Sequence, residues 1–174
     1  RQRRIADEER TIAQSVNTFL NDELLAEAAP ERAGVDARVI DMLDNAGASL
    51  NARTELPARV EAALRTTLGT TYLRTGAPSE AQPHLRRAIE LYDSLDKPID
   101  RALTQLTLAE THFRLRIPDE AETLTNNAYE TLSDLLPPTD PRLLDARQEI
   151  ASAIKWAGET ERARDLYTSI LNNR

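Results

Sequence analysis

The chain has 174 residues, of which 40% are hydrophobic and 29% are charged, and its formal net charge is −7. This length and composition are typical of a soluble domain, or of a short array of repeats, with a core of its own. The acidic balance argues against nucleic acid as the main partner, and the absence of cysteine excludes disulfides, thiol nucleophiles and cysteine-ligated metals.

Apolar residues recur at helical spacing along nearly the whole chain. Residues 1–28 predict a long amphipathic helix, which the Pro- and Gly-containing segment 28–34 ends. A second helix is expected from about Asp36, a plausible N-cap, and a third from Pro57 to Gly76. No segment alternates with a period of two over more than a few residues. We therefore expect an all-α fold.

Comparison of the sequence with itself indicates a repeat. A shift of 40 residues aligns Pro78 with Pro118 and Ala81 with Ala121, and a further shift of 42 aligns Ala121 with Ala163. Each copy would consist of a helix, a tight turn and a second helix. The predicted organisation is an N-terminal region, 1–57, that holds the long helix and a capping helix, followed by three repeats at residues 58–97, 98–139 and 140–174.

Small residues recur at the positions where the two helices of a copy would cross. They are Gly69, Ala109 and Ala151 in the first helices and Ala81, Ala121 and Ala163 in the second helices. At such crossings a small side chain allows two backbones to approach closely. These positions predict close helix pairs in all three copies.

The first copy resembles the tetratricopeptide repeat. The residues that carry the likeness stand in the family's order, and they are Leu68, Gly69, Tyr72, Ala81, Leu85 and Ala88. The second copy departs from the pattern with Ala109 for the glycine and His112 for the tyrosine. A spacing of 40–42 residues exceeds the usual length of about 34, and is similar to the long-repeat variant of kinesin light chains and of many bacterial regulators. The resemblance implies a right-handed α-solenoid of helical hairpins behind the long N-terminal helix.

Residues 15–46 carry a second resemblance. The runs FLNDELL and DMLDNA are similar to the segment that joins a membrane helix to such repeats in bacterial signalling proteins, including receptor-like Ser/Thr kinases and winged-helix regulators. This implies a kinase or DNA-binding domain and a single membrane helix before Arg1, with the repeats outside the cytoplasm as a periplasmic part. A cytoplasmic location is the alternative. Because the chain begins with Arg, we expect it to be a piece of a longer protein.

The spacing of polar residues assembles no site for catalysis. His84 and His112 lie in different copies without a metal-binding pair, and the hydroxyl residues lack a nucleophile elbow. Acidic clusters such as 7–9 are expected on solvated helix faces. No run approaches the roughly 18 apolar residues of a membrane span. We expect no enzyme activity, no catalytic residue, no metal or other cofactor, and no membrane insertion by this part of the chain.

Binding is the function that remains. The resemblance implies that the first helices line an inner, concave surface. The family's positions on that surface are Ala63, Thr66, Thr70, Leu73 and Arg74 in copy one, Leu103, Leu106, Glu110, Phe113 and Arg114 in copy two, and Asp145, Gln148, Ser152, Lys155 and Trp156 in copy three. The candidate ligand-binding residues among them are Thr70, Arg74, Leu106, Glu110, Phe113, Arg114, Ser152, Lys155 and Trp156. Exposed Trp and Arg are typical of interfaces; for Phe113 and Trp156 the alternative is packing between repeats.

Two hypotheses of different classes follow from these observations. The first is a sensor or adaptor module that binds a protein or peptide through the concave face. Its ligand would carry acidic residues followed by an apolar one, to match Arg74, Arg114 and Trp156. The second is a structural or dimerisation module, in which the N-terminal helix either mediates self-association as a homodimer or folds back to fill the groove.

Overall fold

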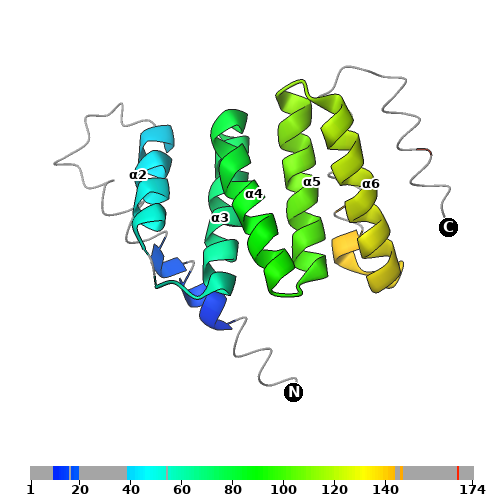
Figure 1. Ribbon diagram of the computed structural model, residues 1–174, viewed down its shortest axis with the longest axis horizontal. Helices are drawn as coiled ribbons and strands as arrows, with labels where there is room; N and C mark the ends of the chain where they lie inside the picture. Colours follow the sequence, from blue (N-terminus) through cyan, green and yellow to red (C-terminus); the bar gives the residue numbers. More distant parts are fainter. Residues whose placement is uncertain are drawn as a thin grey trace.

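The computed structural model describes residues 10–15, 17–19, 39–53, 55–143, 146 and 168. All regular structure in these residues is helical, which confirms the all-α expectation for the described part of the chain. Residues 10–15 and 17–19 are helical. The longer helices are α2 (Val39–Ala52), α3 (Ala58–Arg74), α4 (Pro78–Ser94), α5 (Pro98–Arg114) and α6 (Pro118–Leu135). Figure 1 shows them side by side in chain order.

Three helices begin in the same way. Each of α4, α5 and α6 starts with a proline, at Pro78, Pro98 and Pro118. Proline suits this first position because its missing N–H would have no partner within the helix, and because its fixed φ already has the helical value. The three starts are 20 residues apart, so a helix and a three-residue turn form the unit of the chain from α4 to α6.

The turns before these prolines also share one geometry. Their left-handed residues are Gly76, Asp96 and Arg116, with φ of 85°, 51° and 63°. The residue that follows donates its N–H to a carbonyl in the last turn of the preceding helix, from Ala77 to Tyr72 at 2.9 Å and equivalently in the other two turns. This six-to-one hydrogen bond ends each helix and reverses the chain. Consecutive helices are therefore antiparallel neighbours.

The helices pack in order. Contacts join α2 to α3, α3 to α4, α4 to α5 and α5 to α6, and α3 also touches α5. Burial repeats with a spacing of 40 residues between the pair α3–α4 and the pair α5–α6. The positions that are buried in both pairs are 62 and 102, 64 and 104, 68 and 108, 69 and 109, 72 and 112, 73 and 113, 81 and 121, 85 and 125, 88 and 128, and 92 and 132. The 40-residue repeat is thus present in the packing as well as in the sequence.

The predicted small residues lie at the helix crossings of these two pairs. A Cβ atom added at Gly69 would come within 2.6 Å of the Leu85 Cγ and 3.2 Å of the Ala81 carbonyl oxygen. Ala109 and Ala121 are 1% and 0% exposed in the second pair. The small side chains at these crossings therefore allow the first and second helix of each pair to approach closely.

Two predictions fall largely outside the described residues. These are the long helix over 1–28, of which residues 10–15 and 17–19 are described, and the third repeat, 140–174, of which residues 140–143, 146 and 168 are described. In the described part of the chain no helix is long and apolar enough to cross a membrane.

Candidate functional site

The two first helices, α3 and α5, adjoin. The Oγ1 atoms of Thr66 and Thr104 lie 3.5 Å apart. Further along, the Arg114 Nη1 donates a hydrogen bond of 2.8 Å to the carbonyl oxygen of Leu73. Side chains on the adjoining helices therefore share one surface.

We call this surface the α3–α5 face. Successive residues on it are four, three and four positions apart, which keeps them on one side of a helix. The face consists of Ala63, Thr67, Thr70 and Arg74 on α3 and of Leu103, Thr107, Glu110 and Arg114 on α5. Arg74 is exposed and the other side chains are half-buried. The two rows correspond position by position at a spacing of 40, with the same residue type at two of the four positions, 67 with 107 and 74 with 114.

Four of the candidate binding residues lie on this face and two do not. Thr70, Arg74, Glu110 and Arg114 belong to it, although only Arg74 is exposed. The expectation that Leu106 and Phe113 line an exposed surface is wrong, because their side chains are 3% and 5% exposed. The candidates of the third copy, Ser152, Lys155 and Trp156, lie outside the described residues.

Leu106 is buried by α6, and Phe113 packs against the small residues at the crossing of α5 and α6. Leu106 belongs to the cluster that contains Tyr129 and Leu132 of α6. Phe113 packs with Ala109 and Ala121, where the short side chains leave room for its ring. Both residues are consequently part of the core that holds α5 against α6, and neither contributes to the α3–α5 face.

Thr67 and Thr107 are the face residues that the sequence-based selection missed. Both are half-buried and occupy equivalent positions of α3 and α5. Their hydroxyls donate to carbonyls four residues earlier, Thr67 to Ala63 at 2.9 Å and Thr107 to Leu103 at 3.3 Å. Because these bonds use the hydroxyl protons, the oxygen atoms offer acceptor capacity at the surface. Steps of four, three and four residues lead from 63 to 74 and again from 103 to 114. This repeated helical spacing is the sequence signal that identifies Thr67 and Thr107.

Arg114 has a structural role at one end of the face. Its Nη2 lies 2.6 Å from the Glu110 Oε1, and the two side chains are 22% and 19% exposed. Its hydrogen bond to Leu73 reaches the last turn of α3, where carbonyl groups carry the negative end of the helix dipole. The expected positive stripe of Arg74 and Arg114 is therefore weaker than predicted, since Glu110 offsets one of the two cations.

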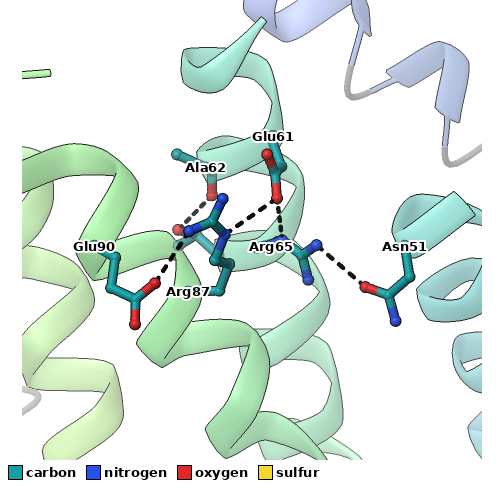
Figure 2. A network of polar contacts seen from close by, with 7 residues as sticks. Asn51, Glu61, Ala62, Arg65, Arg87 and Glu90 are labelled. Atoms are coloured by element: carbon teal, nitrogen blue, oxygen red, sulfur yellow. Dashed lines mark hydrogen bonds and ion pairs between the residues drawn. The ribbon is translucent and has the colours of Figure 1, made fainter. Parts of the chain in front are cut away.

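A second polar cluster connects α2, α3 and α4 (Figure 2). The Glu61 Oε1 accepts a hydrogen bond of 2.7 Å from the Arg65 Nε and lies 3.5 Å from the Arg87 Nε. Arg65 also donates to the Asn51 Oδ1 at 3.1 Å, and Arg87 pairs with the Glu90 Oε2 at 3.1 Å. Both carboxylates of this cluster are thus paired with guanidinium groups. The arrangement ties three helices together and leaves no carboxylate poised as a general base.

Among the residues that the structure describes, no group of three or more His, Asp or Glu side chains is placed to hold a metal ion. Comparison of the whole sequence with models of known protein families and with curated proteins found no match.

Proposed function

We propose that the chain is a non-catalytic binding module whose α3–α5 face binds an extended protein or peptide segment. The observation that carries this proposal is the match between the two rows of the face. Equivalent residues 40 apart, Thr67 with Thr107 and Arg74 with Arg114, lie on adjoining helices of one surface. A surface that repeats its chemistry from one helix to the next suits a ligand that is itself extended.

The chemistry of the face suits a polypeptide. The threonine oxygens and the Glu110 carboxylate can accept hydrogen bonds from backbone N–H groups, and the exposed Arg74 can pair with an acidic side chain. Ala63 and Leu103 supply an apolar end to the same face. We infer a ligand with an acidic residue that reaches Arg74 and an apolar residue about three helical turns away along α3.

The likeness of residues 58–139 to tetratricopeptide repeats supports this proposal, because first helices line the binding surface in that family. From the same likeness we also propose that the helical pairs form a right-handed solenoid. From the resemblance of residues 15–46 we propose that the chain is the periplasmic sensor part of a membrane-anchored bacterial signalling protein. An apolar run of about 20 residues in any segment before Arg1 would support the membrane anchor.

The alternative, a homodimer formed by the N-terminal helix, is less well supported. Phe19 is 3% exposed and belongs to the same core as Leu43 of α2 and Leu64 of α3. The Arg53 guanidinium lies 5.4 Å from the centre of the Phe19 ring. This part of the N-terminal segment packs on its own chain, which favours folding back over pairing with a second copy.

A displayed peptide library selected on the purified chain tests the proposal. Selected peptides should lose binding by about tenfold or more when Thr67 or Thr107 is replaced by Arg, because the larger cation obstructs the centre of the face. Asn126→Arg, which adds the same side chain at an exposed position of α6, is the matched control. Circular dichroism of each variant reports whether the fold is retained. Peptides that bind both face variants as well as wild type, but fail on Asn126→Arg, would place the binding surface on the second helices.

A further inference from the structure

A cavity of about 370 Å³ opens among α4, α5 and α6. We call it the His112 cavity, and its lining residues are Arg86, Leu108, His112, Asp119, Glu120, Thr123 and Leu124. At 3.6 residues per turn, Leu108 and His112 lie on roughly the opposite side of α5 from Thr107 and Glu110. The cavity is therefore separate from the α3–α5 face, and what it binds is independent of the proposed function.

The repeat explains why a cavity forms here. Position 112 is equivalent to Tyr72, whose phenol in the first helix pair is 2% exposed and donates a hydrogen bond of 2.8 Å to the Asp44 Oδ1 of α2. The Tyr72 ring also stacks on His84, with ring centres 5.6 Å apart and planes inclined by 16°. In the second pair an imidazole replaces the phenol, and Leu124 stands at the position of His84. In the pair α3–α4 the Tyr72 phenol fills the space beside the second helix. In the pair α5–α6 the smaller His112 ring leaves the equivalent space partly open.

His112 presents an unused donor at this cavity. Its side chain is 1% exposed, and its Nε2 lies 2.9 Å from the amide nitrogen of Gln82 and 3.5 Å from the Arg86 Nη2. Both neighbours are donors, so the Nε2 accepts and the proton resides on the Nδ1. Burial lowers the pKa of His112, which keeps the ring neutral near pH 7.

The Nδ1 has no hydrogen-bond partner among the described residues. The Glu120 Oε2 lies 3.5 Å from it, beyond the usual N–H···O range. A buried donor without a partner costs free energy, so it favours a ligand that supplies an acceptor. The Glu120 carboxylate beside it already accepts from the Arg86 Nη2 at 3.2 Å, and its oxygens can accept a further hydrogen bond. A single hydroxyl oxygen can serve both, because it accepts from the Nδ1–H and donates to the carboxylate.

We propose that the His112 cavity binds a phenol. The hydroxyl would bridge the His112 Nδ1 and the Glu120 carboxylate, and the ring would lie against the apolar side chains of Leu108 and Leu124. A neutral ligand is favoured because Asp119 and Glu120 oppose an anion while Arg86, which pairs with Glu120 at 3.2 Å, opposes a cation. The phenol can belong to a small molecule or to a tyrosine side chain, since both present the same group.

Titration of the chain with p-cresol, followed by NMR of leucine methyl and histidine ring signals, tests the site. Saturable shifts are expected for Leu108, Leu124 and His112, and none for Leu103 on the α3–α5 face. Toluene lacks the hydroxyl and should bind about tenfold more weakly, because it cannot bridge the imidazole and the carboxylate. N-acetyltyrosinamide distinguishes the two sources. Binding as tight as that of p-cresol indicates a tyrosine side chain, and weaker binding indicates a free phenol.

Two variants control the experiment. His112→Tyr places a phenol of the chain itself at the position that Tyr72 occupies in the first pair, so p-cresol should no longer shift the leucine signals. Glu120→Gln, at an exposed position, should keep the fold and weaken p-cresol binding about fivefold. The proposal is overturned if p-cresol gives no saturable shift up to its solubility limit. It is equally overturned if toluene binds as tightly as p-cresol, or if His112→Tyr binds p-cresol like wild type.

Discussion

Replacement of Gly69 by Ala tests how closely α3 and α4 approach. The added Cβ would lie 2.6 Å from the Leu85 Cγ and 2.7 Å from its Cδ2, closer than two non-bonded carbon atoms approach in proteins. The Ala81 carbonyl oxygen, 3.2 Å away, blocks a second direction. Because Leu85 is 0% exposed, its side chain has no open space to enter. The variant must therefore push the two helices apart or force Leu85 out of its preferred rotamer.

Two opposing terms set the size of the effect. Alanine is favoured over glycine in a helix interior by about 1 kcal/mol. Overpacking a filled core costs about 1–3 kcal/mol, and the upper half of that range applies because the contact involves the branch point of Leu85 and a backbone atom. We expect Gly69→Ala to lower the free energy of unfolding by a net amount of about 1–2 kcal/mol. For a chain of this size the melting temperature should fall by roughly 2–8 °C.

The second helix pair supplies the matching control. There Ala109 stands at the position of Gly69 and Thr125 at that of Leu85, and the Thr125 hydroxyl donates to the Ala121 carbonyl at 2.8 Å. In a Leu85→Thr background, Gly69→Ala should therefore be neutral or stabilising by up to about 1 kcal/mol. Urea unfolding of the four proteins measures this coupling. An equal loss in both backgrounds would show that contact with residue 85 is not the cause.

Three further outcomes are expected from the packing. Ala121→Leu should lower the free energy of unfolding by about 1–3 kcal/mol in urea titrations, while Asn126→Leu on the exposed side of α6 should leave it nearly unchanged. Arg114→Ala should cost about 1–3 kcal/mol in the same assay, since it leaves a half-buried carboxylate unpaired and removes a donor from the end of α3; an unchanged stability would mean that this tie is dispensable. Burial lowers the folded-state pKa of His112 below its ordinary 6.5, so the unfolded chain binds the proton more readily. Stability should then be highest above about pH 6.5 and fall as the pH drops, by at most about 1.4 kcal/mol per unit for this group. His112→Gln should lose less over the same range, and because His84 remains in both proteins its contribution cancels.

The helices were predictable because their sequence signals are local. Pro78 and Pro118, which the self-comparison aligns, are the first residues of α4 and α6, and Pro98, where the second predicted repeat begins, is the first residue of α5. The predicted helix from Pro57 to Gly76 is found as Ala58–Arg74. Equivalent apolar positions in two copies reinforce each other, so the self-comparison of the sequence gives the register of the packing without any knowledge of the partners.

Exposure on α5 was less predictable because it depends on neighbours. Leu106 and Thr111 are buried, whereas their equivalents on α3, Thr66 and Thr71, are half-buried. Leu106 is covered by Tyr129 and Leu132 of α6 and by Leu143 and Ala146. Family positions transferred to the sequence carry no information on these neighbours. The role of Arg114 was missed for a similar reason, since its partner Leu73 is a backbone carbonyl 41 residues away.

Differences between the two helix pairs separate into those that the packing compensates and those that it does not. Where the first pair has Gly69 against Leu85, the second has Ala109 against Thr125, so a larger residue on one helix is matched by a smaller one on the other. Where the first pair has Tyr72, the second has His112, and the shorter ring leaves an unpaired donor beside a cavity. A compensated exchange preserves the core and needs no ligand. At position 112 the His112 Nε2 accepts from Gln82, but the exchange gives up packing and leaves the Nδ1 donor without a partner among the described residues. For this reason the His112 cavity is where a ligand is expected.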